Sequence, residues 1–303
     1  MIIPNQSNIK VHYAGLENQE FAQILNKLSG VKYGLFTVFP FISRMQGIKG
    51  YKFSTVTDQC PIFLQENFRH VIMDSGLFTL MFGAHSGRRD AAFIEEWYRN
   101  LTEFVLRVGF TGTVVEVDCQ KVLGVEKAKE FRRRMKKDLP NNRQINVFHI
   151  DDGQKGLDEM IEFSEYIAVS VPELRKLGKK NHCVKLVNYI KNKKPSIDIH
   201  LLGCTENKLL HELNFATSSD STAWQQVGRY GELKMNLGDG TQSIHNKQIN
   251  KDLMKKTFSP HLENELSNWW EELTEKQFDY YSKYALAGQA TLKQYAHYGG
   301  DQS

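Results

Sequence analysis

Short apolar runs alternate with longer segments of helical spacing along this chain, and this alternation restricts its fold more than any other feature. The apolar runs that resemble buried strands lie at residues 33–39, 70–73, 113–117, 145–150, 166–169 and 197–202, with weaker candidates at 215–219 and 233–237. Between them, apolar residues recur at helical intervals over residues 91–108, 125–137, 157–164, 184–192 and 206–213. Continuous apolar strands that alternate with helices predict a parallel sheet covered by helices on both faces.

The number of these units and the lack of a break between them favour one large domain. The chain has 303 residues and only seven prolines, with no internal repeat and no proline-rich hinge. Six to eight strand–helix units in one undivided chain predict an α/β protein, a (β/α)₈ TIM barrel with an N-terminal extension, over residues 1–303. Residues 260–303 carry aromatic residues at helical intervals, which predicts a C-terminal helical extension packed on the barrel. An open, doubly wound sheet is the alternative.

Composition and cysteine placement argue against several other classes of protein. No apolar run approaches the length of a membrane span, so we expect no membrane partner. The N-terminal residues lack the basic start and long apolar core of a secretory signal. The four cysteines lie far apart without a C-x-x-C pair, which argues against a disulfide framework or a zinc knuckle and favours a cytoplasmic protein. The net charge of +4 is compatible with a nucleic-acid partner but not diagnostic of one.

Carboxylates follow directly after four of the predicted strands. Asp74 ends "HVIMD", Asp118 follows "TVVEV", and Asp220 follows "FATSS". Asp151 and Asp152 follow "INVFHI". In a parallel barrel all strands end at the same face, which is where the active sites of TIM barrels lie. Acids gathered there should differ in pKa, so that one serves as an ionised nucleophile while another donates and accepts a proton.

Each acid also has a simpler explanation, because Asp is a favoured residue in turns and at helix N-caps. A single position fits either interpretation, whereas the recurrence favours a site. Metal hydrolysis fits less well, since no H-x-x-x-H or H-x-H pair occurs, and we interpret His149 and His200 as core histidines of apolar strands. The glycine-rich nucleotide motifs and the G-x-S-x-G elbow are also missing. Paired carboxylates without a metal suit chemistry at a sugar C1 carbon.

Three segments resemble the tRNA-guanine transglycosylase superfamily in the same order along the chain. The segment "VIMDSGLFTLMFG" is similar to its D-S-G-G-[FY]-Q signature, and "EVDC" is similar to its D-x-C segment. The segment "IHLLGCTENKLLHELNFATSSDSTAW" resembles the later block, in which a strand ending in glycine precedes a helix and a strand with an Asp nucleophile. The segment "HYAGLENQEFAQILNKLSGVKYGLFTVF" resembles the start of the 7-deazaguanine DNA transglycosylases of phages and bacterial modification islands. The resemblance covers residues 11–225.

The resemblance implies a (β/α)₈ barrel and an enzyme, a glycosyltransferase that exchanges guanine for a preQ0-type 7-deazaguanine base without cutting the strand. Asp220 would match the nucleophile, which attacks C1′ and forms a covalent glycosyl–enzyme intermediate. Asp74 would match the acid–base residue, which protonates the leaving guanine and then deprotonates the incoming base. Asp118 would match the acid that reads the edge of the base. Phe78 falls where an aromatic ring stacks on the base.

Further base contacts follow from the same comparison. Ser75 and Gly76 would offer backbone donors or room for the base, and Gly203 is the glycine that ends the strand of the later block. Ser170 falls near a glycine-rich segment that contacts the base in the family, although this chain does not reproduce the glycines. The family's Gln-Gly pair is missing, and Asp152 with Gly153, or else His149, stands near its place.

The chain departs from the tRNA enzymes in its metal-binding cysteines. Those enzymes carry a C-x-C-x-x-C…H zinc site after the nucleophile, whereas no cysteine follows Cys204 here. The resemblance therefore implies no cofactor, because the usual zinc site is absent. The loss of this site and the change of D-S-G-G-F-Q to D-S-G-L-F-T point to the smaller phage type and to the cytoplasm, of the host if a phage encodes the chain.

The expected partners are DNA, or tRNA as the alternative, and a free 7-deazaguanine base. Arg88, Arg89 and Arg229 lie near the expected site loops and are the candidate phosphate contacts, whereas the basic run "FRRRMKK" is typical of a solvated helix face. A non-enzymatic alternative is a barrel subunit that supports a partner without catalysing a reaction. The sequence leaves open whether the chain forms a homodimer. The pairing of Asp74 with Asp220 argues against a purely structural subunit.

Overall fold

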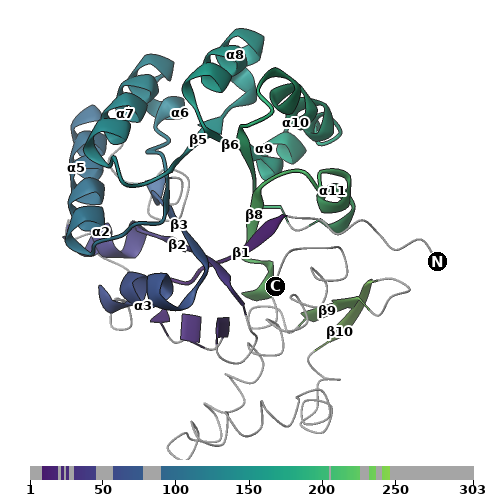
Figure 1. Cartoon of the computed structure of the whole chain (residues 1–303), viewed down its shortest axis with the longest axis horizontal. Helices are drawn as coiled ribbons and strands as arrows, with labels where there is room; N and C mark the ends of the chain where they lie inside the picture. The colour runs from purple at the N-terminus through teal and green to yellow at the C-terminus, as the bar shows by residue number, and fades with distance from the viewer. Residues whose placement is uncertain are drawn as a thin grey trace, which may run out of the picture.

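Eight parallel strands form a closed barrel in a computed structural model of this chain (Figure 1). The structure describes residues 9–19, 22–23, 25–26, 31–45, 57–77, 90–204, 206–225, 232–236 and 241–245. The barrel strands are β1 Lys10–Ala14, β2 Tyr33–Thr37, β3 His70–Asp74, β4 Thr113–Val115, β5 Gln144–Phe148, β6 Tyr166–Ser170, β7 Asp198–Leu202 and β8 Ser218–Ser221. This arrangement confirms the predicted (β/α)₈ fold.

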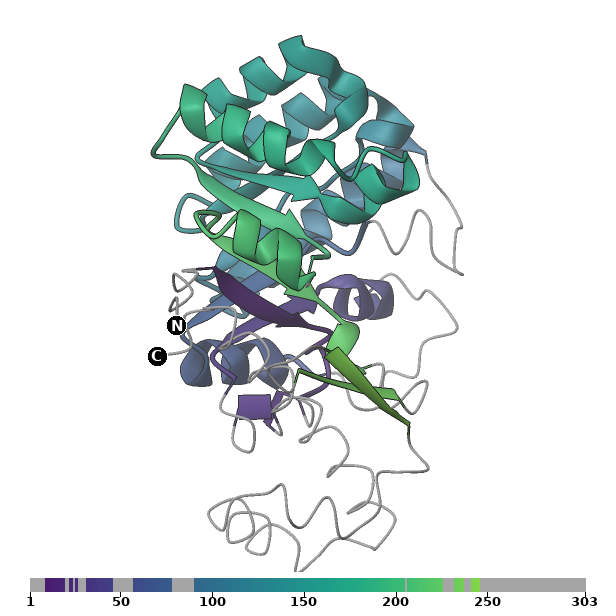
Figure 2. The same cartoon turned by 90° about the vertical axis from the view of Figure 1, so that its right-hand side faces the viewer.

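Helices surround the strands, as both views of the molecule show (Figures 1 and 2). The described α-helices are α2 Phe39–Met45, α3 Gln59–Asn67, α5 Ala91–Arg107, α6 Gln120–Leu123, α7 Val125–Asp138, α8 Gly153–Phe163, α9 Val171–Lys176, α10 His182–Lys193 and α11 Asn207–Glu212. Two short 3₁₀ turns, η2 Ile150–Asp152 and η3 Ala223–Gln225, follow β5 and β8. No helix within the described ranges is long and apolar enough to cross a bilayer.

The sequence of α5 explains both its start and its packing. The side chain of Asp90 accepts a hydrogen bond from the backbone N–H of Phe93 at 2.9 Å, which caps the first turn. Apolar residues at intervals of three and four then form one buried face, which includes Ile94, Trp97 and Leu101. This face packs against the barrel, in the large cluster of apolar side chains between the strands and the helices.

A second, smaller apolar cluster fills the interior of the barrel. It consists of Ala14, Leu35, Ile72, Val115, Ile145, Val147, Tyr166 and Ala168. Side chains alternate between the two faces of a strand, so residues two positions further along point into the same interior. Thr37, Asp74 and Ser170 each lie two positions after a member of this cluster, at the carboxyl end of their strand. The geometry of the strands therefore turns these polar side chains into the barrel mouth.

Three histidines also occupy the barrel interior, a region that branched aliphatic side chains usually fill. His12 and His70 each lie two residues before a member of the interior cluster, and His200 lies two residues before Leu202, which packs against it. The Nε2 atom of His12 lies 2.8 Å from Nδ1 of His70, whose Nε2 lies 2.9 Å from the Thr113 hydroxyl. Burial and neighbouring positive charges lower the pKa of His70 to about 4, so this ring carries no charge at neutral pH.

The structure differs from the sequence prediction at the first strand. Strand β1 begins at Lys10, upstream of the first apolar run that predicted a strand, and it closes the barrel by pairing with β8. Its inward-facing His12 interrupts the apolar pattern, which explains why the sequence did not reveal it. The run at 233–237 forms no barrel strand, because β9 Glu232–Asn236 pairs only with β10 Thr241–His245 in a separate antiparallel sheet. The predicted extension over residues 260–303 lies outside the described residues.

Candidate active site

Asp74 ends strand β3 and faces the interior of the barrel at its mouth. Its Oδ1 atom accepts a hydrogen bond of 2.7 Å from the backbone N–H of Gly76 and lies 3.5 Å from the Thr37 hydroxyl. Burial raises the pKa of this carboxyl, the hydrogen bond from Gly76 opposes the increase, and the charges of Asp220 and Asp118 add to it. The resulting pKa of about 6 makes Asp74 able to carry a proton near neutral pH.

Asp220 lies on β8, the strand that completes the barrel, and it is held from two directions. The backbone N–H of Gly203 donates to Oδ1 at 2.8 Å, and Nε2 of His200 lies 3.1 Å from the same oxygen. The other oxygen, Oδ2, has no partner among the residues that the structure describes. Because 13% of the side chain is exposed, this second oxygen is the one available to a ligand.

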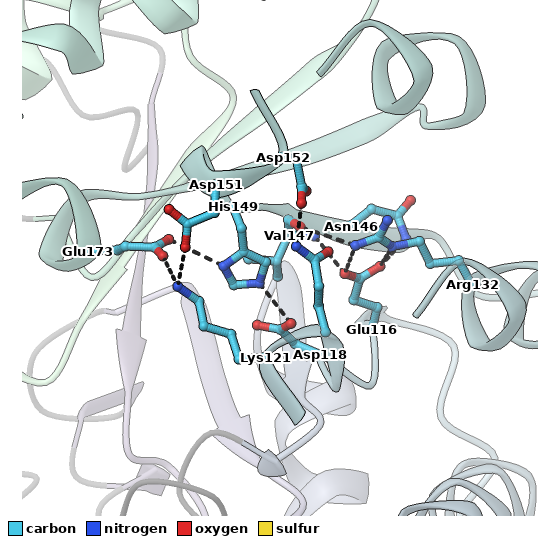
Figure 3. Close-up of polar contacts among 11 residues, drawn as sticks. Glu116, Asp118, Lys121, Arg132, Asn146, Val147, His149, Asp151, Asp152 and Glu173 are labelled. Carbon is cyan, nitrogen blue, oxygen red and sulfur yellow. Dashed lines mark hydrogen bonds and ion pairs between the residues drawn. The ribbon is translucent and has the colours of Figure 1, made fainter. Parts of the chain in front are cut away.

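Asp118 lies between β4 and α6 and forms an ion pair with His149 (Figure 3). Nε2 of His149 lies 2.8 Å from Oδ1 of Asp118, while Nδ1 lies 3.3 Å from Oε2 of Glu173. Burial alone would lower the pKa of His149, but the hydrogen bonds and charges of these two carboxylates outweigh it and raise the pKa to about 10. His149 is therefore an imidazolium at neutral pH, with both of its N–H groups engaged by protein carboxylates.

Glu173, the second residue bound to His149, comes from the first turn of α9. The hydrogen bond from His149 lowers its pKa to about 2, with burial opposing and a contact of 2.5 Å from Lys121 contributing further. Lys121 also reaches Asp151 at 3.4 Å. Asp118, His149, Glu173, Lys121 and Asp151 thus form one charged cluster over the ends of β4, β5 and β6, which we call the His149 network.

Asp152 lies apart from the other predicted acids. Its Oδ1 atom accepts a hydrogen bond of 2.5 Å from Nε2 of Gln120, and the residue lines a cleft between α7 and α8. Asp220 and Asp118 are the acids whose charges raise the pKa of Asp74. The structure therefore brings together three of the predicted acids at the barrel mouth and places Asp152 on the side that faces the outer helices.

Ser75 and Gly76 complete the turn after Asp74. The Ser75 carbonyl accepts a hydrogen bond of 2.9 Å from the Trp97 indole, and the Gly76 N–H is the donor to Asp74. Gly76 has a φ of +71°, and a Cβ atom there would lie 2.7–2.9 Å from Phe39 atoms, so only glycine fits without a shift. These contacts give both residues a role in holding the carboxyl group of Asp74.

Ser170 and Gly203 lie at the ends of neighbouring strands. The hydroxyl of Ser170 accepts a hydrogen bond of 3.3 Å from the N–H of Glu173 and caps α9. This helix-capping role is simpler than the contact with a base that the sequence comparison implied. Gly203 has a φ of +64° and directs its N–H at Asp220. The remaining predicted contacts, Phe78, Arg88, Arg89 and Arg229, lie outside the described residues.

Sequence reasoning missed the roles of two histidines. His149 and His200 are buried and hydrogen-bonded, as expected of core residues, but their partners include Asp118 and Asp220, two of the predicted site acids. Because both ring nitrogens of His149 are engaged, this residue has no free donor to take the place of the family's glutamine. The signal that could have identified them was a histidine within each of the largely apolar runs 145–150 and 197–202.

Gln120 and Glu173 were also missed. Gln120 is 8% exposed, and its Oε1 atom is buried without a partner among the described residues. Glu173 follows Pro172 in a segment that resembles an ordinary helix start, which hid its contact with His149.

Neither a metal cluster nor a close relative identifies the site. Within the described ranges, no group of three or more His, Cys, Asp or Glu side chains is placed to hold a metal ion. The chain matches no protein-family model, and no curated protein is significantly similar to it.

Proposed function

We propose that this protein is a DNA-guanine transglycosylase, an enzyme that exchanges guanine for a 7-deazaguanine base through a covalent Asp220–glycosyl intermediate. The observation that carries the proposal is the difference between two carboxylates at one barrel mouth. Asp74 has a pKa raised to about 6, whereas Asp220 receives two hydrogen bonds on Oδ1, which suits a carboxylate, and keeps Oδ2 free. One group can therefore handle a proton while the other attacks carbon.

In the first half of the reaction, Oδ2 of Asp220 attacks C1′ of the target nucleotide. The bond between C1′ and N9 of guanine breaks, and the protonated carboxyl of Asp74 supplies the proton that guanine needs to leave as a neutral base. The target base has to leave the helical stack before C1′ can be reached. The products of this step are free guanine, an Asp220–C1′ ester and the carboxylate of Asp74.

In the second half, the incoming 7-deazaguanine base occupies the space that guanine vacated. The carboxylate of Asp74 takes the proton from N9 as this nitrogen attacks C1′, and the ester bond to Asp220 breaks. Asp74 regains its proton and Asp220 its charge, so the cycle balances without a cofactor.

In this proposal, Asp118 reads the edge of the base. Its Oδ1 atom is bound by the imidazolium of His149, while Oδ2 has no partner in the described part of the chain and 21% of the side chain is exposed. A carboxylate oxygen accepts hydrogen bonds only, so it would select a base that presents N–H groups on that edge, as guanine and 7-deazaguanine do.

Labelled 7-deazaguanine base, supplied with either guanine-containing DNA or tRNA, tests the proposal directly. We expect label in DNA and a covalent adduct that survives denaturation. Asp220→Asn should abolish the adduct, whereas Asp74→Asn should bind DNA normally and fail to exchange the base. Label in tRNA alone would assign the enzyme to RNA, and label in neither substrate would support the non-catalytic subunit.

The pH dependence of adduct formation tests the role of Asp74. Because the acid form of Asp74 is required in the first half-reaction and its pKa is about 6, the single-turnover rate of adduct formation should fall about tenfold per pH unit well above pH 6. A rate that stays constant between pH 6 and 8.5 would contradict the assignment of Asp74 as the proton donor. Adduct formed at each pH can be measured by quenching with denaturant and resolving the cross-linked product.

A further inference from the structure

A chain of hydrogen bonds runs from the middle of the barrel to Asp220. The hydroxyl of Tyr166 lies 2.5 Å from Oγ of Ser218, and the same Oγ lies 2.5 Å from Nδ1 of His200. Nε2 of His200 then lies 3.1 Å from Oδ1 of Asp220. Tyr166, Ser218 and His200 are 2%, 0% and 1% exposed, so solvent does not compete for these contacts.

The direction of each hydrogen bond in this chain can be deduced from its two ends. A carboxylate accepts hydrogen bonds only, so Nε2 of His200 has to carry the hydrogen that points at Asp220. At the other end, the Tyr166 hydroxyl has Ser218 as its hydrogen-bond partner among the described residues, so its hydrogen goes to Oγ of Ser218. Ser218 then has its own hydrogen left to donate to Nδ1 of His200. In this arrangement every donor and acceptor is used once, with the His200 hydrogen on Nε2 and Nδ1 as an acceptor.

Two further rings of the barrel interior lie beside His200. The ring of His12 on β1 lies 6.5 Å away, and that of Tyr166 on β6 lies 6.4 Å away. The pKa of His12 is lowered well below its ordinary value by burial and by the neighbouring histidines, and the pKa of His70 is about 4. His12 and His70 are thus uncharged at neutral pH.

We propose that His200 is a positioning residue for Asp220, and that Ser218 and Tyr166 fix the tautomer that allows it to act. The imidazole and the Gly203 N–H hold Oδ1 from two sides, so the carboxylate cannot rotate and Oδ2 stays turned away from both donors. The reactive oxygen is thereby set before substrate arrives. The kinetic consequence of this inference rests on the proposed function, whereas the expected tautomer of His200 does not.

The tautomer can be measured in the whole protein without any substrate. Long-range ¹H–¹⁵N correlation spectra of protein labelled at histidine distinguish an Nε2–H ring, an Nδ1–H ring and an imidazolium. The chain has ten histidines, and the spectrum of the His200→Gln variant identifies the signals of His200 by their loss. We expect the Nε2–H form at pH 7, and in Ser218→Ala a mixture of forms. An Nδ1–H ring or an imidazolium in the unaltered protein would overturn the proposal.

The kinetic test separates positioning from a general effect on the fold. His200→Leu should lower the single-turnover rate of adduct formation by about 10- to 100-fold, the effect of losing one hydrogen bond to a charged group, while the Kd for DNA stays within about threefold. His200→Gln retains an amide donor and should recover most of the rate. Ser218→Ala, a smaller change, should lower the rate by about 3- to 10-fold, and it serves as the test if His200→Leu does not fold.

Thr113→Val is the matched control, because it removes a buried hydroxyl from the same interior layer at a position that contacts His70 instead of His200. Its adduct rate should stay within about twofold of the unaltered protein. Unchanged rates in the His200 and Ser218 variants would overturn the positioning role while leaving the transglycosylase proposal intact. If the unaltered protein forms no adduct, the proposed function fails, and the NMR spectrum alone decides the inference.

Discussion

Two carboxylates on the same side of the barrel, only two residues apart in sequence, have opposite surroundings (Figure 3). Glu116 is 2% exposed at its side chain and accepts four hydrogen bonds, two from the Arg132 guanidinium and one each from the Asn146 amide and the Val147 N–H. Asp118 is 21% exposed and is held by His149 alone. We call the first set of contacts the Glu116 network.

The difference between the two networks shows how a structural carboxylate can be told from one that is available to a ligand. Both oxygens of Glu116 are saturated, so the group can only join helix α7 to strands β4 and β5. Asp118 keeps one oxygen unbound, and its partner His149 is charged because the carboxylates of Asp118 and Glu173 raise its pKa. A buried carboxylate with all of its hydrogen bonds made has no oxygen left for a ligand, whereas a partly exposed carboxylate with an unbound oxygen can accept a hydrogen bond from one.

The largest effect should come from breaking the Glu116 network. Arg132→Met leaves the carboxylate of Glu116 buried without its cation, so the free energy of unfolding should fall by about 3–5 kcal/mol. Denaturation by urea measures this loss. The control is Arg133→Met, which changes the next residue of the same helix at an exposed position and should stay within about 0.5 kcal/mol. A loss below about 1 kcal/mol for Arg132→Met would show that the Glu116 network does not stabilise the fold.

A smaller loss of stability, dependent on pH, should follow from breaking the His149 network. His149→Gln removes the charge between Asp118 and Glu173, so the free energy of unfolding should fall by about 2–3 kcal/mol at pH 6. The pKa of His149 is raised from 6.5 to about 10, so its contribution is complete below pH 6.5 and is lost as the pH rises to 10. The pKa of Glu173 is lowered from 4.5 to about 2, so its contribution is complete above pH 4.5 and is lost toward pH 2.

The difference between His149→Gln and the unaltered protein should therefore be greatest between pH 4.5 and 6.5 and should shrink at pH 9.5. Urea denaturation at these pH values measures it. His182→Gln changes an exposed histidine at the start of α10 and provides the control. An equal loss at every pH would mean that His149 stabilises the protein through packing rather than through its charge.

The smallest effect should come from the outer edge of the His149 network. The side chain of Lys121 is 39% exposed and pairs with Glu173 and Asp151, so Lys121→Met should cost less than about 1 kcal/mol. Adding salt should reduce this cost further, because solvent ions screen an exposed pair. A cost as large as that of His149→Gln in the same urea experiment would show that the exposed edge of the His149 network stabilises the protein as much as its buried centre.

The sequence was sufficient to predict the barrel and the position of three of the acids at its mouth, but not that of Asp152. Apolar strands that alternate with helices indicate a parallel sheet. All strands of a parallel barrel end at the same face, and this does not depend on how individual side chains pack. Asp74, Asp118 and Asp220 could therefore be assigned to the barrel mouth from their positions after strands.

The contacts that define the site could not be predicted in the same way. His200 reaches Asp220 because β7 and β8 pair in a register that places His200 opposite Ser218, and register is a property of the closed sheet. His149 contacts Glu173 only because the helix after β6 begins beside the end of β5. Strand β1 was missed because a polar His12 faces the interior, where the search for strands assumed apolar side chains.

The pairing of β1 with β8 also has a consequence for how the molecule matures. Asp220 lies opposite His12 in that pairing, so the strand that joins the two ends of the sheet also carries the third acid of the barrel mouth. A polypeptide that emerges from the ribosome as far as residue 204 already contains Asp74 and Asp118 but lacks Asp220. If the proposed mechanism holds, a chain can react with a nucleic acid only after β8 has been made and has paired with β1.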